Sequence, residues 1–174
     1  MKTLEIRRHS IRSPLSEHLN QKGVMLARRI GQTIGPFDLV ATSMHHRAFE
    51  TAIAMGFAVD EQSESLNTYG HDVEREAPWP QPYSNLAEAV KQEGAAAKYA
   101  RKLAHYYTAM LGLVSDGGSA LVINHGGVAE LGVIGCLPDL DYSNWGGPVS
   151  YCEGARLFWD DGKFVKAEVL RVPH

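Results

Sequence analysis

The chain has 174 residues, of which 44% are apolar and 21% are charged, as in an ordinary folded protein with one sizeable core. Its formal net charge of −3 gives no basic footprint for nucleic acid. The two cysteines lie far apart, which argues against a disulfide framework or a cysteine-rich zinc site. The N-terminus lacks an apolar leader, and no run has the roughly 18 apolar residues of a membrane span. We therefore expect one cytoplasmic domain over residues 1–174 that binds neither nucleic acid nor membrane and needs no cofactor.

Two strand–helix units are predicted in the first third of the chain. Residues 3–8 alternate between apolar and polar side chains as a strand does, and Asn20 is placed to cap a helix that stops at Gly35. Residues 38–42 form a second apolar strand, and the helix after it stops at Gly56. Strands that alternate with helices are typical of a mostly parallel sheet with right-handed crossovers.

The rest of the chain continues this pattern after a long irregular stretch, residues 57–83. Residues 84–114 are predicted to be helical with a break near Gly94, and their repeating apolar positions place Tyr107 and Met110 in the core. The continuous apolar run at 119–123 is typical of a central strand buried on both faces. A short helix to Gly135 follows it.

The C-terminal segment is predicted to add antiparallel strands. Residues 148–152 are predicted to be a strand, and Asp161-Gly162 is a strong hairpin turn between 155–159 and 164–170. The hairpin is expected at the edge of the sheet. The fold class is therefore α/β, a three-layer α/β/α sandwich around a central, mostly parallel sheet.

Polar residues that suit phosphoryl transfer follow three of the predicted strands. Because the carboxyl ends of parallel strands meet at one edge of a sheet, we expect His9, Arg47 and His125 to converge. Arginine forks bind phosphate oxygens in pairs, and a neutral imidazole is a competent nucleophile toward phosphorus. Gly126 lets the backbone and a helix N-terminus approach an anion closely.

Other interpretations exist for each of these residues. The arginines alone would suit a solvated surface, and His125 alone would suit a satisfied core position. A metal site is a further alternative, but no known ligand spacing is present and nearby arginines repel a cation, so no metal is expected. Its candidate ligands would be His45, His46, His71, Asp72 and His125. Of His45 and His46, we expect one at the rim of the site and one exposed.

Four short motifs span residues 4–127 in a fixed order. They comprise Arg8-His9 with Arg12 and Pro14, then Leu19 with Gly23, then Ser43, Arg47, Ala48, Thr51 and Ala52, then His125-Gly126. In this order they resemble the motifs of the histidine phosphatase superfamily, which has the phosphoglycerate mutase-like fold. The match is to the branch whose second histidine motif is His-Gly, and the size is closest to the short phosphohistidine phosphatases.

The resemblance implies a role for each matched residue. His9 would be the nucleophile that becomes phosphorylated, and His125 would stabilise the transition state. Phosphate would be held by Arg8, Arg12, Arg47 and Gly126. A small phosphorylated substrate or a phosphoprotein would be the partner, and a phosphate or sulfate ion would be expected in the pocket.

The sequence departs from the family at two points. Ser10 stands where the first motif usually has glycine. The general acid that often lies in a Leu-x-Glu motif is missing, because the best match is Leu66-Asn67-Thr68. Asp72 is our preferred substitute and Glu74 its competitor in the same segment. The alternative interpretation is that both are solvated loop acids.

These observations predict a metal-independent phosphatase acting on a phosphomonoester or phosphohistidine through phospho-His9. The first alternative is a catalytically silent domain that binds a phosphorylated ligand in the same arginine pocket. The second is phosphoryl transfer of the phosphoglycerate mutase type, which we consider less favoured because residues 57–83 offer little material to enclose a substrate.

Overall fold

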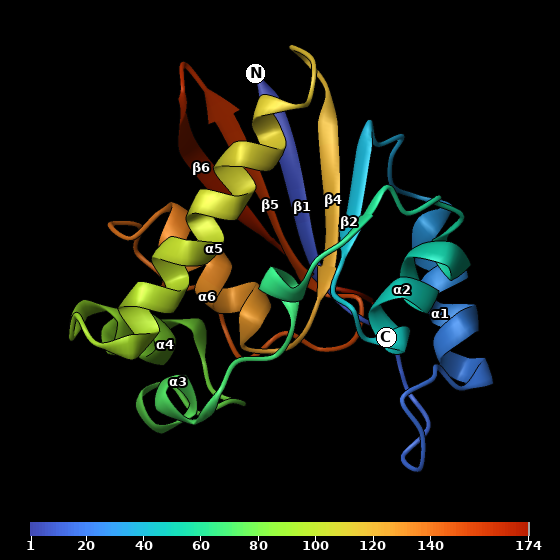
Figure 1. Ribbon diagram of the computed structural model, residues 1–174, viewed down its shortest axis with the longest axis horizontal. Coiled ribbons are helices and arrows are strands. Elements are labelled where there is room, and N and C mark those ends of the chain that lie inside the picture. The colour runs from blue at the N-terminus through green and yellow to red at the C-terminus, as the bar shows by residue number, and fades with distance from the viewer. Residues whose placement is uncertain (174) are drawn as a thin grey trace.

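The computed structural model describes residues 1–173 and contains one mixed sheet between two layers of helices (Figure 1). The strands are β1 (Lys2–Arg8), β2 (Leu39–Thr42), β3 (Glu61–Gln62), β4 (Ser119–Asn124), β5 (Gly154–Asp160) and β6 (Lys163–Leu170). The helices are α1 (Gln21–Gly31), α2 (His46–Met55), the 3₁₀ helix η1 (Glu64–Leu66), α3 (His71–Glu76), α4 (Tyr83–Lys91), α5 (Ala95–Gly112) and α6 (Val128–Cys136).

The six strands lie in the order β3-β2-β4-β1-β5-β6. The first four are parallel, whereas β5 and β6 pair antiparallel at one edge. β1 and β4 are adjacent central strands, and their register pairs Arg8 with Asn124, so both strands end at the same level. The predicted mostly parallel sheet with an antiparallel hairpin at its edge is confirmed.

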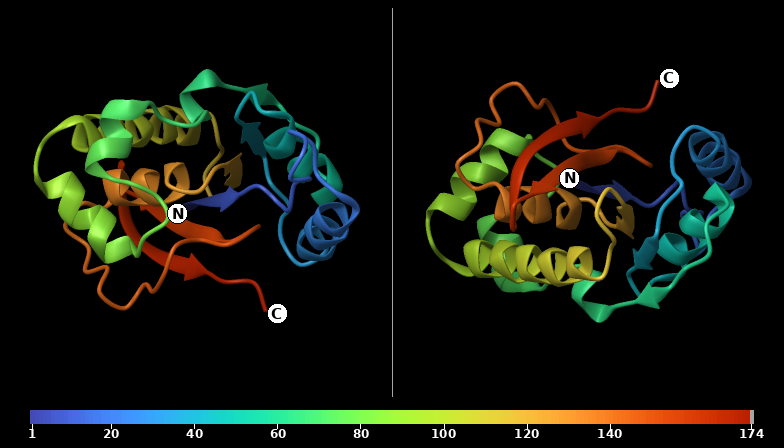
Figure 2. Two further views of the ribbon diagram at one scale, coloured as in Figure 1. Left: turned by 90° about the horizontal axis from the view of Figure 1, so that it is seen from below. Right: turned by 90° about the horizontal axis from the view of Figure 1, so that it is seen from above.

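The helices cover opposite faces of the sheet (Figure 2). The side chains of β4 alternate accordingly: Leu121 and Ile123 belong to the core under α1 and α2, whereas Ala120 and Val122 belong to the larger core under α4, α5 and α6. Tyr107 and Met110 of α5 are buried in the larger core, as predicted. The predicted three-layer α/β/α architecture is therefore confirmed.

The helix boundaries follow local signals in the sequence. The side chain of Asn20 accepts a hydrogen bond from the N–H of Gly23 at 2.8 Å and caps α1, as predicted. Gly56 ends α2 with a φ of 97°, a left-handed conformation that glycine adopts without strain. α1 ends at Gly31, earlier than predicted, where its backbone packs so closely on Met55 that a Cβ atom would lie 2.0 Å from the Met55 carbonyl oxygen.

Two further sequence predictions differ from the structure. The segment 57–83 is not wholly irregular, because it contains β3, η1 and α3. The predicted strand at 148–152 is wrong: these residues form a loop, in which the N–H of Val149 donates to the Glu130 carboxylate and the N–H of Ser150 donates to Glu153. Within residues 1–173, no helix is long and apolar enough to cross a membrane.

Candidate active site

The ends of β1, β2 and β4 meet, as the parallel topology requires. The N–H of His9 donates to the carbonyl of Asn124 at 2.9 Å, and the N–H of Ser43 donates to the carbonyl of Ile123 at 3.2 Å. The rings of His9 and His125 consequently lie 5.3 Å apart, measured between centroids. The structure thus brings together the three strand ends that the sequence singled out.

The protonation of the His9 ring is determined by two contacts. Nδ1 lies 2.7 Å from the carbonyl oxygen of Ser10, which only accepts hydrogen bonds, so Nδ1 carries the proton. Nε2 therefore carries a lone pair, which accepts a hydrogen bond from Nε of Arg47 at 3.3 Å. The nitrogen without a proton is thus the one that faces the arginine.

Burial and positive charge keep His9 neutral. Burial, together with the charges of Arg8, Arg47 and Arg12, lowers the pKa of His9 to about 3, and the hydrogen bond to Ser10 opposes the shift. At neutral pH the ring is therefore a neutral imidazole beside three guanidinium groups. This is the form that attacks phosphorus.

Ser10 fits its place despite replacing the usual glycine. Its hydroxyl donates to the carbonyl of Gly23 at 2.7 Å, and its N–H donates to Oγ1 of Thr51 at 2.9 Å. Thr51 in turn donates to the carbonyl of Arg47 at 2.7 Å. This chain of bonds ties the backbone beside His9 to the helix turn that carries Arg47.

Ser43 determines the tautomer of His125. Its Oγ accepts from the N–H of His45 at 3.3 Å and lies 2.8 Å from Nε2 of His125, so the hydroxyl is placed to donate to that nitrogen. Nδ1 of His125 then carries the proton, and this buried N–H has no partner among residues 1–173. Burial lowers the pKa of His125 to about 2, with further contributions from His9, Arg47 and His45, so the ring donates as a neutral imidazole.

Arg8 is held between two aromatic rings. Its guanidinium carbon lies 4.8 Å from the ring centroid of Trp79 and 4.2 Å from that of Tyr151, and Nη1 donates to the carbonyl of Val149 at 3.3 Å. These two rings frame the Arg8 side chain. Tyr83 and Trp145 are not part of this contact and pack together in the larger core, with centroids 5.0 Å apart.

Arg12 and Arg47 share a carboxylate that the sequence did not single out. Glu17 forms an ion pair with Arg47, and its other oxygen lies 3.4 Å from Nη1 of Arg12. His45 also contacts this carboxylate, with Nδ1 3.4 Å from Glu17, and its ring lies 4.8 Å from that of His125. Glu17 lies in a loop and matches no motif, so only its position in space reveals it.

The two glycines after His125 make room for aromatic side chains. A Cβ atom at Gly126 would lie 2.3 Å from the Trp79 ring, and one at Gly127 would lie 2.2 Å from the Tyr69 hydroxyl. The N–H of Gly127 also donates to the Glu130 carboxylate at 2.7 Å. The expected role of Gly126 in phosphate binding stays a prediction, while its contact with Trp79 gives a packing reason for the glycine.

Asp72 and Glu74, on the short helix α3, have different surroundings. Asp72 pairs with Arg75, and its side chain is 77% exposed. Glu74 lines a small pocket of about 140 Å³ beside Gly126, which we call the Gly126 pocket. The other residues that line it are Thr68, Tyr69 and Trp79. The structure thus places Glu74, and not Asp72, in a pocket with one predicted site residue, Gly126.

No family model matches the sequence, and no curated protein matches it. Solved structures match over nearly the whole chain. A phosphoserine phosphatase from Entamoeba histolytica, in complex with 3-phosphoglyceric acid, has a TM-score of 0.69 at 16% identity, covering 99% of this chain and 98% of that one. A mycobacterial glucosyl-3-phosphoglycerate phosphatase has a TM-score of 0.67 at 16% identity, covering 99% and 100%. A phosphoglycerate mutase from Bacillus anthracis has a TM-score of 0.64 at 17% identity, covering 98% and 92%.

The chain has the phosphoglycerate mutase-like fold. In this fold His45 lies at the rim of the site, whereas His46 is exposed and stacks on His18, as expected. Cys152 is a buried residue of the smaller core, and burial raises the pKa of its thiol. No group of three metal-binding side chains is present within residues 1–173.

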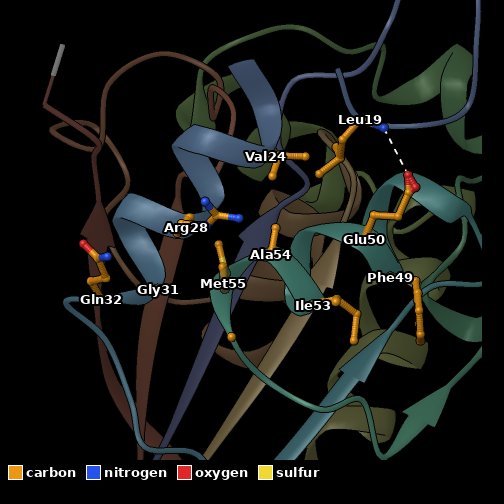
Figure 3. A pocket seen from close by; sticks show the side chains of 11 residues that line it. Leu19, Val24, Arg28, Gly31, Gln32, Phe49, Glu50, Ile53, Ala54 and Met55 are labelled. Atoms are coloured by element: carbon orange, nitrogen blue, oxygen red, sulfur yellow. Dashed lines mark hydrogen bonds between the residues drawn. The ribbon is translucent and has the colours of Figure 1, made fainter. Parts of the chain in front are cut away.

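A hollow larger than the Gly126 pocket lies away from His9. It is a cavity of about 690 Å³ between α1 and α2, and its mostly apolar lining includes Val24, Ile53 and Met55 (Figure 3). Glu50 lies at one end of this cavity and accepts a hydrogen bond from the N–H of Leu19 at 3.2 Å. The cavity therefore borders the loop that carries Glu17 but does not contain the histidines.

Proposed function

We propose that the chain is a metal-independent phosphatase that hydrolyses a phosphomonoester or a phosphohistidine through phospho-His9. The observation that carries this proposal is the state of His9. Nδ1 carries the proton and donates it in a hydrogen bond to the Ser10 carbonyl, and Nε2 presents a lone pair toward Arg47. A residue that only binds phosphate would need a donor at this position. The lone pair on Nε2 supports nucleophilic attack.

The reaction takes two displacements at phosphorus. In the first, Nε2 of His9 attacks, a P–N bond forms, and the bond to the leaving oxygen or nitrogen breaks. In the second, water attacks the phosphorus, the P–N bond breaks, and inorganic phosphate is released. Arg8, Arg12, Arg47 and the Nδ1–H of His125 stabilise the negative charge on the phosphoryl oxygens in both steps.

A carboxyl group on α3 supplies the proton for the leaving atom. The sequence favoured Asp72, whereas the contacts favour Glu74, because Glu74 lines the Gly126 pocket and Asp72 pairs outward with Arg75. We propose that Glu74 protonates the leaving atom in the first step and takes a proton from the attacking water in the second. The Gly126 pocket then receives the leaving group.

The substrate class rests on the site and on the likeness to known proteins. The structural neighbours are described as phosphatases of phosphoserine and glucosyl-3-phosphoglycerate and as a phosphoglycerate mutase. The aligned mutase is covered over 92% of its length, so chain length does not separate mutase from phosphatase chemistry here. We favour hydrolysis of a small phosphomonoester, with phosphohistidine as the second substrate class.

The test is hydrolysis of p-nitrophenyl phosphate in the presence of a chelator. The wild type is compared with His9→Ala and with His105→Ala, which removes an exposed histidine of α5. We expect activity in the wild type and in His105→Ala and none in His9→Ala, and wild-type protein quenched in alkaline detergent, in which the P–N bond is stable, should carry label from a ³²P-labelled substrate. Phosphate binding without activity above that of His9→Ala would instead indicate the silent binding domain.

A further inference from the structure

We propose that Glu17 is an internal anion, whose carboxylate occupies the Arg12–Arg47 site until a phosphoryl group displaces it. The displaced carboxylate then selects for phosphomonoesters that lack a carboxylate beside the phosphate. This inference deepens the proposed function and rests on it. Its basis is that the Glu17 carboxylate contacts Arg47, Arg12 and His45 together. Both arginines are predicted to bind the substrate phosphate, so their present partner competes with it.

The carboxylate is held by several cations but is not locked in place. Its side chain remains 51% exposed, although Arg47, His45 and Arg12 lower the pKa of its carboxyl group despite the desolvation that raises it. A carboxylate carries one charge, whereas a phosphomonoester dianion brings nearly two charges and three acceptor oxygens. The dianion therefore has the advantage in competition for the two guanidinium groups.

The loop that carries Glu17 cannot move far when the carboxylate is displaced. Arg12 and Leu19 form a β-bridge across its base, and the N–H of Ser13 donates to the carbonyl of His18 at 3.0 Å. Glu50 on α2 accepts hydrogen bonds from the ring of His18 and the N–H of Leu19, the latter drawn in Figure 3. The backbone of Glu17 is thus anchored at both ends, and its displaced carboxylate stays near the mouth of the site.

The charges around the proposed position of the leaving group also disfavour a carboxylate in the substrate. The lining of the Gly126 pocket, within the part of the chain that the structure describes, contains Glu74 and no lysine or arginine. A leaving group with a carboxylate would meet Glu74 there without a lysine or arginine in the lining to balance it. Like charges oppose binding, so neutral or cationic leaving groups are favoured.

Calorimetric titration of the His9→Ala protein tests the inference without turnover. The ligands are inorganic phosphate, glycerol 3-phosphate and 3-phosphoglycerate; the last two differ in a hydroxymethyl group against a carboxylate. With Glu17 present, we expect glycerol 3-phosphate to bind about fivefold more tightly than 3-phosphoglycerate. Adding Glu17→Gln should tighten phosphate binding about fivefold and narrow the difference in affinity between the two organic ligands, while the part due to Glu74 remains.

Two further variants test whether the Glu17 carboxylate competes with phosphate by contacting Arg12 and Arg47 or only through its negative charge. Glu17→Asp keeps the charge but is one methylene shorter, so it should tighten phosphate binding while keeping the preference for glycerol 3-phosphate. Glu88→Gln removes an exposed charge that pairs with Lys91 on α4, and it should change neither quantity. Unchanged phosphate affinity in Glu17→Gln, or preference for 3-phosphoglycerate with Glu17 present, would overturn the inference. Glu17-dependent binding in a protein without hydrolytic activity would instead sink the proposed function alone.

Discussion

The hydroxyl oxygen of Ser43 lies 2.8 Å from Nε2 of His125, and this contact determines which ring nitrogen of His125 carries a proton. Replacing Ser43 with alanine removes the donor and lets the other tautomer form, which has no N–H at Nδ1. Loss of one such hydrogen bond in the transition state should lower kcat about tenfold.

Nitrogen-15 NMR of the histidine rings measures the tautomer of His125 directly, and p-nitrophenyl phosphate hydrolysis measures kcat. Ser63→Ala, at the cap of η1, is the matched control and should leave both unchanged. A Ser43→Ala protein with the wild-type tautomer and wild-type kcat would contradict the assigned role.

The two buried histidines should make the protein less stable in mild acid. The pKa is about 3 for His9 and about 2 for His125, mainly because burial disfavours the charged ring, against an ordinary 6.5 in the unfolded chain. Both folded-state values are lowered, so the unfolded state binds more protons below pH 6.5. The free energy of unfolding is therefore fully retained above pH 6.5 and falls as the pH drops toward 3, by up to about 1.4 kcal/mol per pH unit for each histidine.

Urea unfolding at pH 7, 6 and 5 measures this slope. His9→Asn should make the slope shallower, since one of the two histidines no longer takes up a proton on unfolding. His105→Asn, at an exposed position, should keep the wild-type slope. Equal slopes in all three proteins would show that the neutral state of His9 does not contribute.

The general acid can be identified from the leaving group. Glu74→Gln should slow the hydrolysis of glycerol 2-phosphate, whose alkoxide needs a proton, by a factor of about 10² or more. Its effect on p-nitrophenyl phosphate should be much smaller, because nitrophenolate leaves with little help. Asp72→Asn should retain alkyl phosphatase activity, since that side chain pairs outward with Arg75. The reverse result, with Asp72→Asn selective against the alkyl ester, would return the role to Asp72.

Glu130 should be needed for the stability of the fold and for the position of Trp79 beside Arg8. Its buried carboxylate accepts hydrogen bonds from Nε1 of Trp79 at 2.9 Å, the N–H of Gly127 at 2.7 Å and the N–H of Val149 at 3.1 Å. Glu130→Ala leaves these donors buried without an acceptor, which should cost about 3 kcal/mol or more in thermal or urea unfolding. Glu130→Gln keeps one carbonyl oxygen and should cost less; equal stability of Glu130→Ala and wild type would refute the prediction.

The parts of the fold that depend on repeating patterns were predictable from the sequence. β4 was predicted because a central strand buried on both faces needs a continuous apolar run, and α5 because its buried residues repeat at helical spacing. His9, Arg47 and His125 were predicted to meet because parallel strands end at one edge. Contacts now link these three residues, although their catalytic roles stay a proposal.

The features that the sequence did not reveal depend on contacts between distant residues. The segment 148–152 has the apolar content of a strand, but the N–H groups of Val149 and Ser150 bond to carboxylates, and Cys152 has a φ of 62°. α3 has only six residues, too few for a periodic signal, and it is held by the burial of Val73. Glu17 has no motif and becomes a site residue only because its loop folds back over Arg47.

The stacking of Arg8 between Trp79 and Tyr151 bears on the entropy of ligand binding. An arginine side chain that becomes ordered loses up to about 2 kcal/mol of rotational freedom. For Arg8 this loss occurs when the chain folds, because the two rings and the Val149 carbonyl already restrict the guanidinium. Its contribution to phosphate affinity is therefore not reduced by ordering on binding, whereas Arg12, with a side chain 44% exposed, still has that freedom to lose.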